Sequence, residues 1–208
     1  MRIQWSPMAL LVLAAAFAAS ASAQTSVGLS LYGAFSQSTS GNNTAQSPSN
    51  SAGGLIELRH ISNPILGLEA TYSYNRANQN YSYNGPAISA ACPSTGCSIS
   101  PATVKANAHE LTLDWIPSVG IGSFRPFGVL GLGLLLNQPT GSQSSTKSSS
   151  QPVYVYGAGL DWGLLPHLGL RFQYRGNLYK APHLTTLYTS TDAFTRTAEP
   201  MIGAYFSF

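Results

Sequence analysis

The feature that most constrains this chain is a two-residue alternation, repeated in eight segments, that separates two kinds of side chain. In segment 168–179, large apolar residues alternate with small, polar or charged ones: Leu168, Leu170, Phe172 and Tyr174 against Gly169, Arg171, Gln173 and Arg175. Successive side chains of a β-strand point to opposite faces, so a period of two predicts a strand with two unlike faces. The chain is therefore expected to be all-β.

The alternating segments are joined by connections of two lengths. We expect strands at 27–37, 53–61, from Leu66 onward, at 104–116, 125–137, 153–163 and 168–179, and a last one at the end of the chain. Long polar stretches at 38–51, 78–101, 138–151 and 180–195 alternate with short links that carry Pro or Gly. This asymmetry is typical of bacterial outer-membrane barrels, whose short turns face the periplasm. The prediction is an up-and-down antiparallel transmembrane β-barrel of eight strands.

The composition is consistent with a membrane barrel and excludes other classes. Only 8% of the residues are charged, about a third of the roughly 25% found in soluble proteins. After residue 23, no apolar run approaches the about 20 residues that a membrane-crossing helix needs. The formal net charge of +3 is small and scattered, so we expect no nucleic-acid partner.

The position of the charged residues decides which face of each strand points inward. Six of the seven acidic residues and three arginines share strand faces with small or polar residues, whereas the opposite faces carry Leu, Tyr, Phe and Trp. These nine form the predicted lumen ion-pair cluster: Glu57, Arg59, Glu69, Glu110, Asp114, Asp161, Arg171, Arg175 and Glu199. Eight strands leave a lumen just wide enough for side chains, and unpaired buried ions are very costly. We therefore expect a plugged, ion-paired interior.

Segment 125–137 has the least regular faces. Four leucines at 130, 132, 134 and 136 oppose Gly131 and Gly133, but Phe127 and Val129 fall on the glycine face. Glycines fit a crowded interior beside long Arg and Tyr side chains, and also tolerate bending in a tight barrel. We predict that the glycine face points into the lumen.

The first 23 residues have the pattern of a secretory signal peptide. A positively charged start precedes the apolar run 8–19, and Ala21-Ser22-Ala23 is a small-x-small cleavage site. We expect cleavage between Ala23 and Gln24, which leaves residues 24–208 as the outer-membrane barrel domain.

Export would place the two cysteines in an oxidising compartment. Cys92 and Cys97 lie in the polar stretch 78–101, and we interpret them as a disulfide that closes a small surface loop. Metal binding is the weaker interpretation, because the pair supplies only two ligands and no His lies near.

Two segments resemble a known family. The last strand, 198–208, which ends in Tyr205-Phe206-Ser207-Phe208, resembles the C-terminal insertion signal of the OmpA/OmpX-type eight-stranded outer-membrane barrels. The glycine-rich hairpin 156–176 is similar to that of porin-family barrels. The resemblance implies the bacterial outer membrane as location, with outer-membrane lipid and lipopolysaccharide as partners. It also implies that the barrel-assembly machinery reads Phe208 during biogenesis.

A structural or surface-interaction role, without enzymatic activity or cofactor, follows from these features. A small barrel that passes a small solute or an apolar ligand is the alternative, although the charged lumen argues against a wide apolar passage. Bilayer conductance separates the two.

One motif points to a barrel enzyme that modifies lipid A. The segment His60-Ile61-Ser62-Asn63 resembles a segment of the outer-membrane lipid A deacylases. That resemblance implies Ser62 as nucleophile and His60 as general base, with Glu69 an acid of the right type to orient the histidine. However, the motif is expected at a periplasmic turn, away from lipid A, and Pro64 follows it as in an ordinary tight turn. We therefore expect no catalytic residue.

Overall fold

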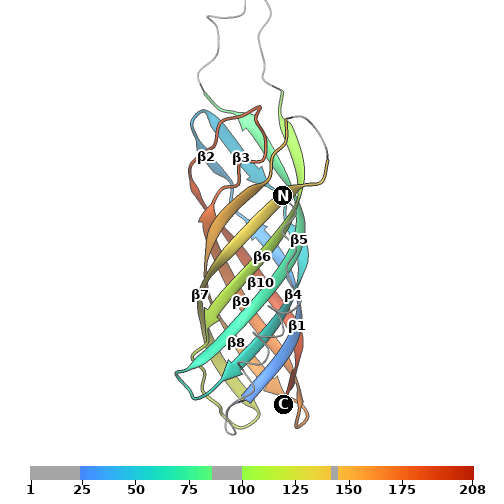
Figure 1. The fold of residues 1–208 in the computed structure, drawn as a ribbon, viewed down its shortest axis with the longest axis vertical. Coiled ribbons are helices and arrows are strands. Elements are labelled where there is room, and N and C mark those ends of the chain that lie inside the picture. The colour runs from blue at the N-terminus through green and yellow to red at the C-terminus, as the bar shows by residue number, and fades with distance from the viewer. Residues whose placement is uncertain (1–23, 86–99, 142–144) are drawn as a thin grey trace, which may run out of the picture.

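The computed structural model describes residues 24–85, 100–141 and 145–208, which form a tall, narrow barrel (Figure 1). Its eight wall strands are β1 Gln24–Ser36, β4 Ser51–Ile61, β5 Gly67–Tyr83, β6 Ala102–Trp115, β7 Phe124–Pro139, β8 Ser149–Gly163, β9 Leu168–Lys180 and β10 Phe194–Ser207. Each strand pairs antiparallel with its sequence neighbours, and the β1–β10 pairing closes the sheet. The predicted eight-stranded barrel is confirmed. Among the described residues, no helix is long and apolar enough to cross a membrane.

The barrel has two unlike ends. The short connections lie at the end where the chain terminates, which we call the turn end, and the long connections lie at the opposite loop end (Figure 1). At the turn end, the link after β4 is closed by Asn63, whose side-chain oxygen accepts bonds from the backbone N–H groups of Ile65 and Leu66. Such Asx turns explain the Ser-Asn-Pro sequence at this position.

The first polar stretch, predicted as a loop at 38–51, is instead a hairpin that extends the wall. Strand β2, Thr39–Gly41, pairs with β3, Thr44–Pro48, and β3 pairs with the upper part of β5. The turn residues Asn42 and Asn43 have φ of 50° and 60°. Left-handed backbone at both central positions is what a two-residue hairpin turn requires, and asparagine tolerates it better than most residues. The prediction was wrong because a run of Ser, Thr and Asn does not show strand alternation.

Side chains of the wall divide as the alternation predicts. The outward face exposes large apolar groups, among them Leu31 at 68% and Leu132 at 65%. The inward face buries polar and charged groups together with small residues. An apolar exterior over most of the wall is stable only in contact with hydrocarbon.

Candidate functional site

The lumen contains all nine charged residues that the sequence assigned to it. Each is at most 5% exposed, and they come from six of the eight wall strands. They divide into two groups along the barrel axis, which we call the turn-half cluster and the loop-half cluster. The turn-half cluster is Arg59, Arg171, Glu57, Glu69 and Asp161; the loop-half cluster is Arg175, Glu110, Asp114 and Glu199.

The turn-half cluster is tightly paired. Arg171 binds Asp161 through two parallel hydrogen bonds, Nε to Oδ1 at 2.6 Å and Nη2 to Oδ2 at 2.9 Å, and it also pairs with Glu57. Arg59 donates from Nε to Glu69 Oε2 at 2.6 Å and from Nη1 to Asp161 Oδ2 at 3.0 Å. Because Asp161 is shared by both guanidiniums, the cluster spans the lumen from β4 and β5 to β8 and β9.

Phe127 explains why segment 125–137 has irregular faces. The guanidinium carbon of Arg59 lies 4.1 Å from the centre of the Phe127 ring, and that of Arg171 lies 5.5 Å from it. A guanidinium over an aromatic face is attracted by the ring quadrupole. Phe127 therefore points inward as part of the turn-half cluster, on the glycine face as predicted.

The loop-half cluster is looser and has a different charge balance. Arg175 is its only guanidinium, at 3.3 Å from Glu110 Oε1 and 3.2 Å from Asp114 Oδ2. Asn177 donates to Glu110 Oε2 at 2.8 Å. Among the residues described, Glu199 forms no ion pair, and its Oε2 has no hydrogen-bond partner. In the loop-half cluster, three carboxyl groups thus face one guanidinium. In the turn-half cluster, three carboxyl groups face two guanidiniums.

Two glycines make room for buried carboxylates. Gly28 lies directly across from Glu57 on β4, and Gly131 lies across from Asp114 on β6. A Cβ atom at either glycine would collide with the carboxylate of its partner. Gly131 has the tighter limit, because an added Cβ would also meet the Cα atom of Asp114. This close approach fits the crowded interior expected for the glycine face of segment 125–137.

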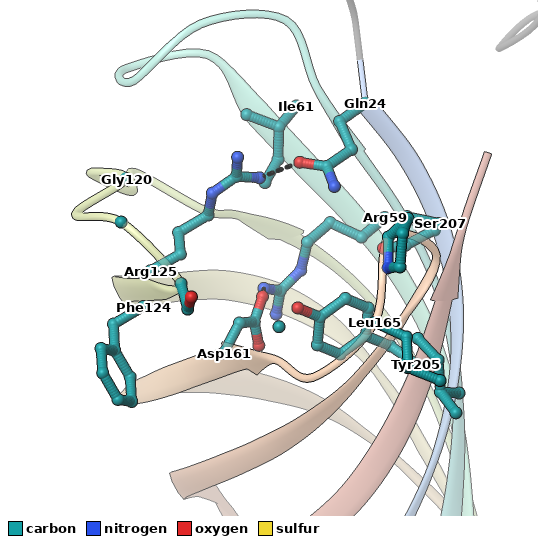
Figure 2. A pocket seen from close by; sticks show the side chains of 16 residues that line it. Gln24, Arg59, Ile61, Gly120, Phe124, Arg125, Asp161, Leu165, Tyr205 and Ser207 are labelled. Atoms are coloured by element: carbon teal, nitrogen blue, oxygen red, sulfur yellow. Dashed lines mark hydrogen bonds and ion pairs between the residues drawn. The ribbon is translucent and has the colours of Figure 1, made fainter.

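Two cavities flank the charged clusters and share no lining residue. The cavity at the turn end has a volume of about 160 Å³, and the one in the loop half has about 30 Å³. Figure 2 shows the turn-end cavity, where Arg125 binds Gln24 near the rim and Arg59, Asp161 and Tyr205 form the floor. The side chains of the two clusters fill the space between the cavities.

The loop end is covered by the connection between β9 and β10, residues 181–193, which we call the cap segment. The Tyr81 hydroxyl donates to Pro182 O at 2.8 Å and accepts from Leu184 N at 3.1 Å. Leu184 is fully buried in an apolar cluster with Tyr81, Val104, Ala106 and Tyr188. The cap segment is thus packed into the barrel mouth beside β2 and β3 (Figure 1).

Every other connection at the loop end contacts the cap segment. Asn42 donates to Ser190 O at 2.8 Å, Thr186 N donates to Ser145 O at 2.8 Å, and Tyr188 donates to Ser100 O at 2.7 Å. At its base, Asp192 binds Lys180 with a 2.7 Å separation. The hydrogen bond and charge of Lys180 lower the pKa of Asp192 below its ordinary value. The sequence pattern did not reveal this covering role.

The histidine motif is not assembled into a catalytic group. Arg59 and Glu69 face each other inside the lumen, whereas His60 lies one position further along β4 and so on the outer face, opposite Leu68. His60 Nδ1 lies 2.9 Å from Thr25 Oγ1. The acid expected to orient the histidine is therefore on the other side of the barrel wall and is bound to Arg59.

The remaining predicted sites are partly described. Phe208 is 71% exposed, its N–H donates to Thr25 O at 2.9 Å, and its ring packs edge-on against Phe206. Cys92, Cys97 and Ala23 lie outside the described residues, while Gln24 begins β1. In the described part of the chain, no three His, Cys, Asp or Glu side chains are arranged to hold a metal ion.

A closed antiparallel wall with an apolar exterior and a charged interior defines the chain as a transmembrane β-barrel. A family model for the outer membrane protein beta-barrel domain matches residues 9–198. The chain belongs to this family, and it is a protein of the bacterial outer membrane, as the sequence predicted. The loop end therefore faces outside and the turn end faces the periplasm.

Solved outer-membrane barrels have the same fold. The chain is similar to Ail, the attachment invasion locus protein of Yersinia pestis, which was solved in complex with the heparin analogue sucrose octasulfate. The two sequences are 15% identical, the match covers 89% of this chain and 99% of Ail, and the TM-score is 0.54. Neisserial surface protein A is 16% identical to this chain; the match covers 88% of this chain and 97% of that protein, with a TM-score of 0.54. OprG from Pseudomonas aeruginosa is 13% identical to this chain; the match covers 90% of this chain and 96% of OprG, with a TM-score of 0.51. No curated protein matches the chain.

Proposed function

We propose that this protein is a non-enzymatic structural and surface-contact barrel whose lumen is closed to solutes. The observation that carries the proposal is closure at two levels. Bonded charges span the middle of the lumen, and the cap segment fills the outer mouth. The cap segment also contacts the other three connections at this end, which supports a single outer surface for contact with the surroundings.

Lipid and lipopolysaccharide are the proposed partners of the wall, and the assembly machinery is the proposed partner of Phe208. The exposed terminal ring beside Phe206 supports access by an assembly factor. Cleavage after Ala23 and a Cys92–Cys97 disulfide stay predictions.

Conductance in planar lipid bilayers tests the closed lumen. The mature protein should give no steady channels. The double variant Arg171→Ser and Arg175→Ser should give openings, because it removes the central guanidinium of each cluster. The control Arg76→Ser and Arg196→Ser removes two arginines from the outer face and should stay silent. Heat-modifiable gel mobility verifies that each variant folds, and steady large channels in the unmodified protein would refute closure.

A small-solute channel is the second candidate, and the two cavities favour it. They approach the clusters from both ends. For this candidate, the unmodified protein must conduct in the same bilayers.

A further inference from the structure

The charges outside the lumen are distributed unevenly. The chain has seven acidic residues; six are buried in the lumen and the seventh, Asp192, is paired with Lys180. Five basic residues lie on the outer half of the protein outside the lumen: Arg76, Lys105, Lys147, Lys180 and Arg196. The outer half therefore presents five cations against one acidic side chain, and four of these cations lack any acidic side chain of this chain as a partner.

Two of these cations are neighbours on the outer face of β5 and β6. Arg76 lies opposite Asn107, and Lys105 lies opposite Asn78, so the two are diagonal across one strand pair. Both side chains are exposed. Thr140 connects them: its hydroxyl accepts from Arg76 Nη2 at 3.2 Å, and its N–H donates to Lys105 O at 2.8 Å. We call Arg76, Lys105 and Thr140 the β5–β6 cation patch.

Beneath the cation patch, the outward-facing side chains of the wall change from apolar to polar aromatic along the barrel axis. Leu113 and Leu111 are exposed apolar residues on β6. Next toward the outside comes a polar aromatic layer, in which the Tyr72 hydroxyl lies 2.8 Å from His109 Nδ1 and Tyr74 donates to Asn107 at 3.2 Å. Apolar residues lie in hydrocarbon and polar aromatics lie at its boundary. The cation patch therefore lies at the level of the outer-leaflet headgroups.

We propose that the β5–β6 cation patch binds the phosphate of an anionic lipid in the outer leaflet, whose acyl chains lie along Leu111 and Leu113. This inference rests on the proposed lipid partnership of the wall and names its site. A guanidinium and an ammonium on one strand pair suit a phosphate, since arginine presents a planar fork to two oxygens and lysine adds a point charge. The apolar band below supplies contact for the chains, which free phosphate does not use.

The opposite wall supplies a matched control. Lys180 and Arg196 are also diagonal across one strand pair, β9 and β10. There, however, Asp192 lies 2.7 Å from Lys180 and neutralises part of the charge. The variants Arg76→Gln with Lys105→Gln, and Lys180→Gln with Arg196→Gln, remove the same number of cations from the two walls.

Native mass spectrometry of the mature protein measures lipid retention from mixed micelles that hold lipid A or neutral phosphatidylcholine. The unmodified protein should retain lipid A preferentially. The β5–β6 variant should lose about thirtyfold in relative affinity, because each basic group near a membrane surface contributes about 1 kcal/mol. The control variant should lose less than about threefold, given the internal Asp192 pair. Arg76→Lys with Lys105→Arg should keep most of the retention.

Several outcomes would overturn the site. Equal losses in both double variants would mean that the surplus charge acts without a defined site. No loss in the β5–β6 variant, or complete displacement of lipid A by inorganic phosphate, would also refute it. Bilayer conductance is read on the same preparations, so a silent lumen together with failed lipid retention would reject this inference alone.

Discussion

The buried charged groups are compensated differently in the two halves of the lumen. In the turn half, two guanidiniums serve three carboxylates, with hydrogen bonds of 2.6–3.0 Å and a shared Asp161. In the loop half, Arg175 alone faces three carboxyl groups at longer distances. A buried ion must be compensated by nearby opposite charge and hydrogen bonds. The comparison indicates that the turn half is redundant and that the loop half depends on one side chain.

Removal of Arg175 should have the largest effect. Arg175→Met leaves Glu110 and Asp114 buried without the guanidinium that pairs with them, and no other guanidinium of that cluster can replace it. We expect the free energy of unfolding to fall by about 5 kcal/mol at neutral pH, the upper end for breaking a buried pair. Urea titration in lipid vesicles measures it, with the exposed Arg196→Met as control. A loss no greater than that of the control would show that Arg175 is dispensable.

Removal of Arg171 should cost less, despite its shorter bonds. Arg171→Met still leaves Arg59 within 3.0 Å of Asp161 and bonded to Glu69, so only Glu57 loses its paired cation. We expect a loss of about 3 kcal/mol, the lower end of the same range. The same urea titration decides the order. A larger loss for Arg171→Met than for Arg175→Met would contradict the redundancy of the turn half.

The sequence predicts the barrel well because one physical rule fixes most of it. A wall between hydrocarbon and a narrow lumen forces alternation, so the strand faces and the number of wall strands can be read from spacing. The charges on one face then show that residues such as Asp114 and Arg171 point inward. The pairing pattern is not readable in the same way. Arg59 reaches Asp161 from β4 to β8 across the lumen, and nothing in local spacing links two strands that are not neighbours.

The loop end was predicted poorly for a related reason. Asn42 and Asn43 form a tight turn, and Leu184 anchors the cap segment, yet both lie in stretches dominated by Ser, Thr and other polar residues. Outside the membrane no hydrocarbon imposes alternation, so strand and loop have similar composition there. The signals present were local: an Asn-Asn pair of the kind that two-residue hairpin turns use, and isolated apolar residues in a polar loop.

Glu199 offers the finest test of the comparison. Its carboxyl is the third beside a single guanidinium, and among the described residues it forms no ion pair, unlike Glu57. Glu199→Gln keeps the shape and removes a buried ionisable group that has no paired cation, so we expect a gain of about 1 kcal/mol in the free energy of unfolding at neutral pH. The matched variant Glu57→Gln removes a carboxylate that is paired with Arg171, and it should destabilise instead. Shifts of opposite sign in the two urea midpoints, at unchanged slope, would establish that only the loop half holds a carboxyl group without a paired cation. A loss of stability in both variants would mean that Glu199 is compensated as well as Glu57.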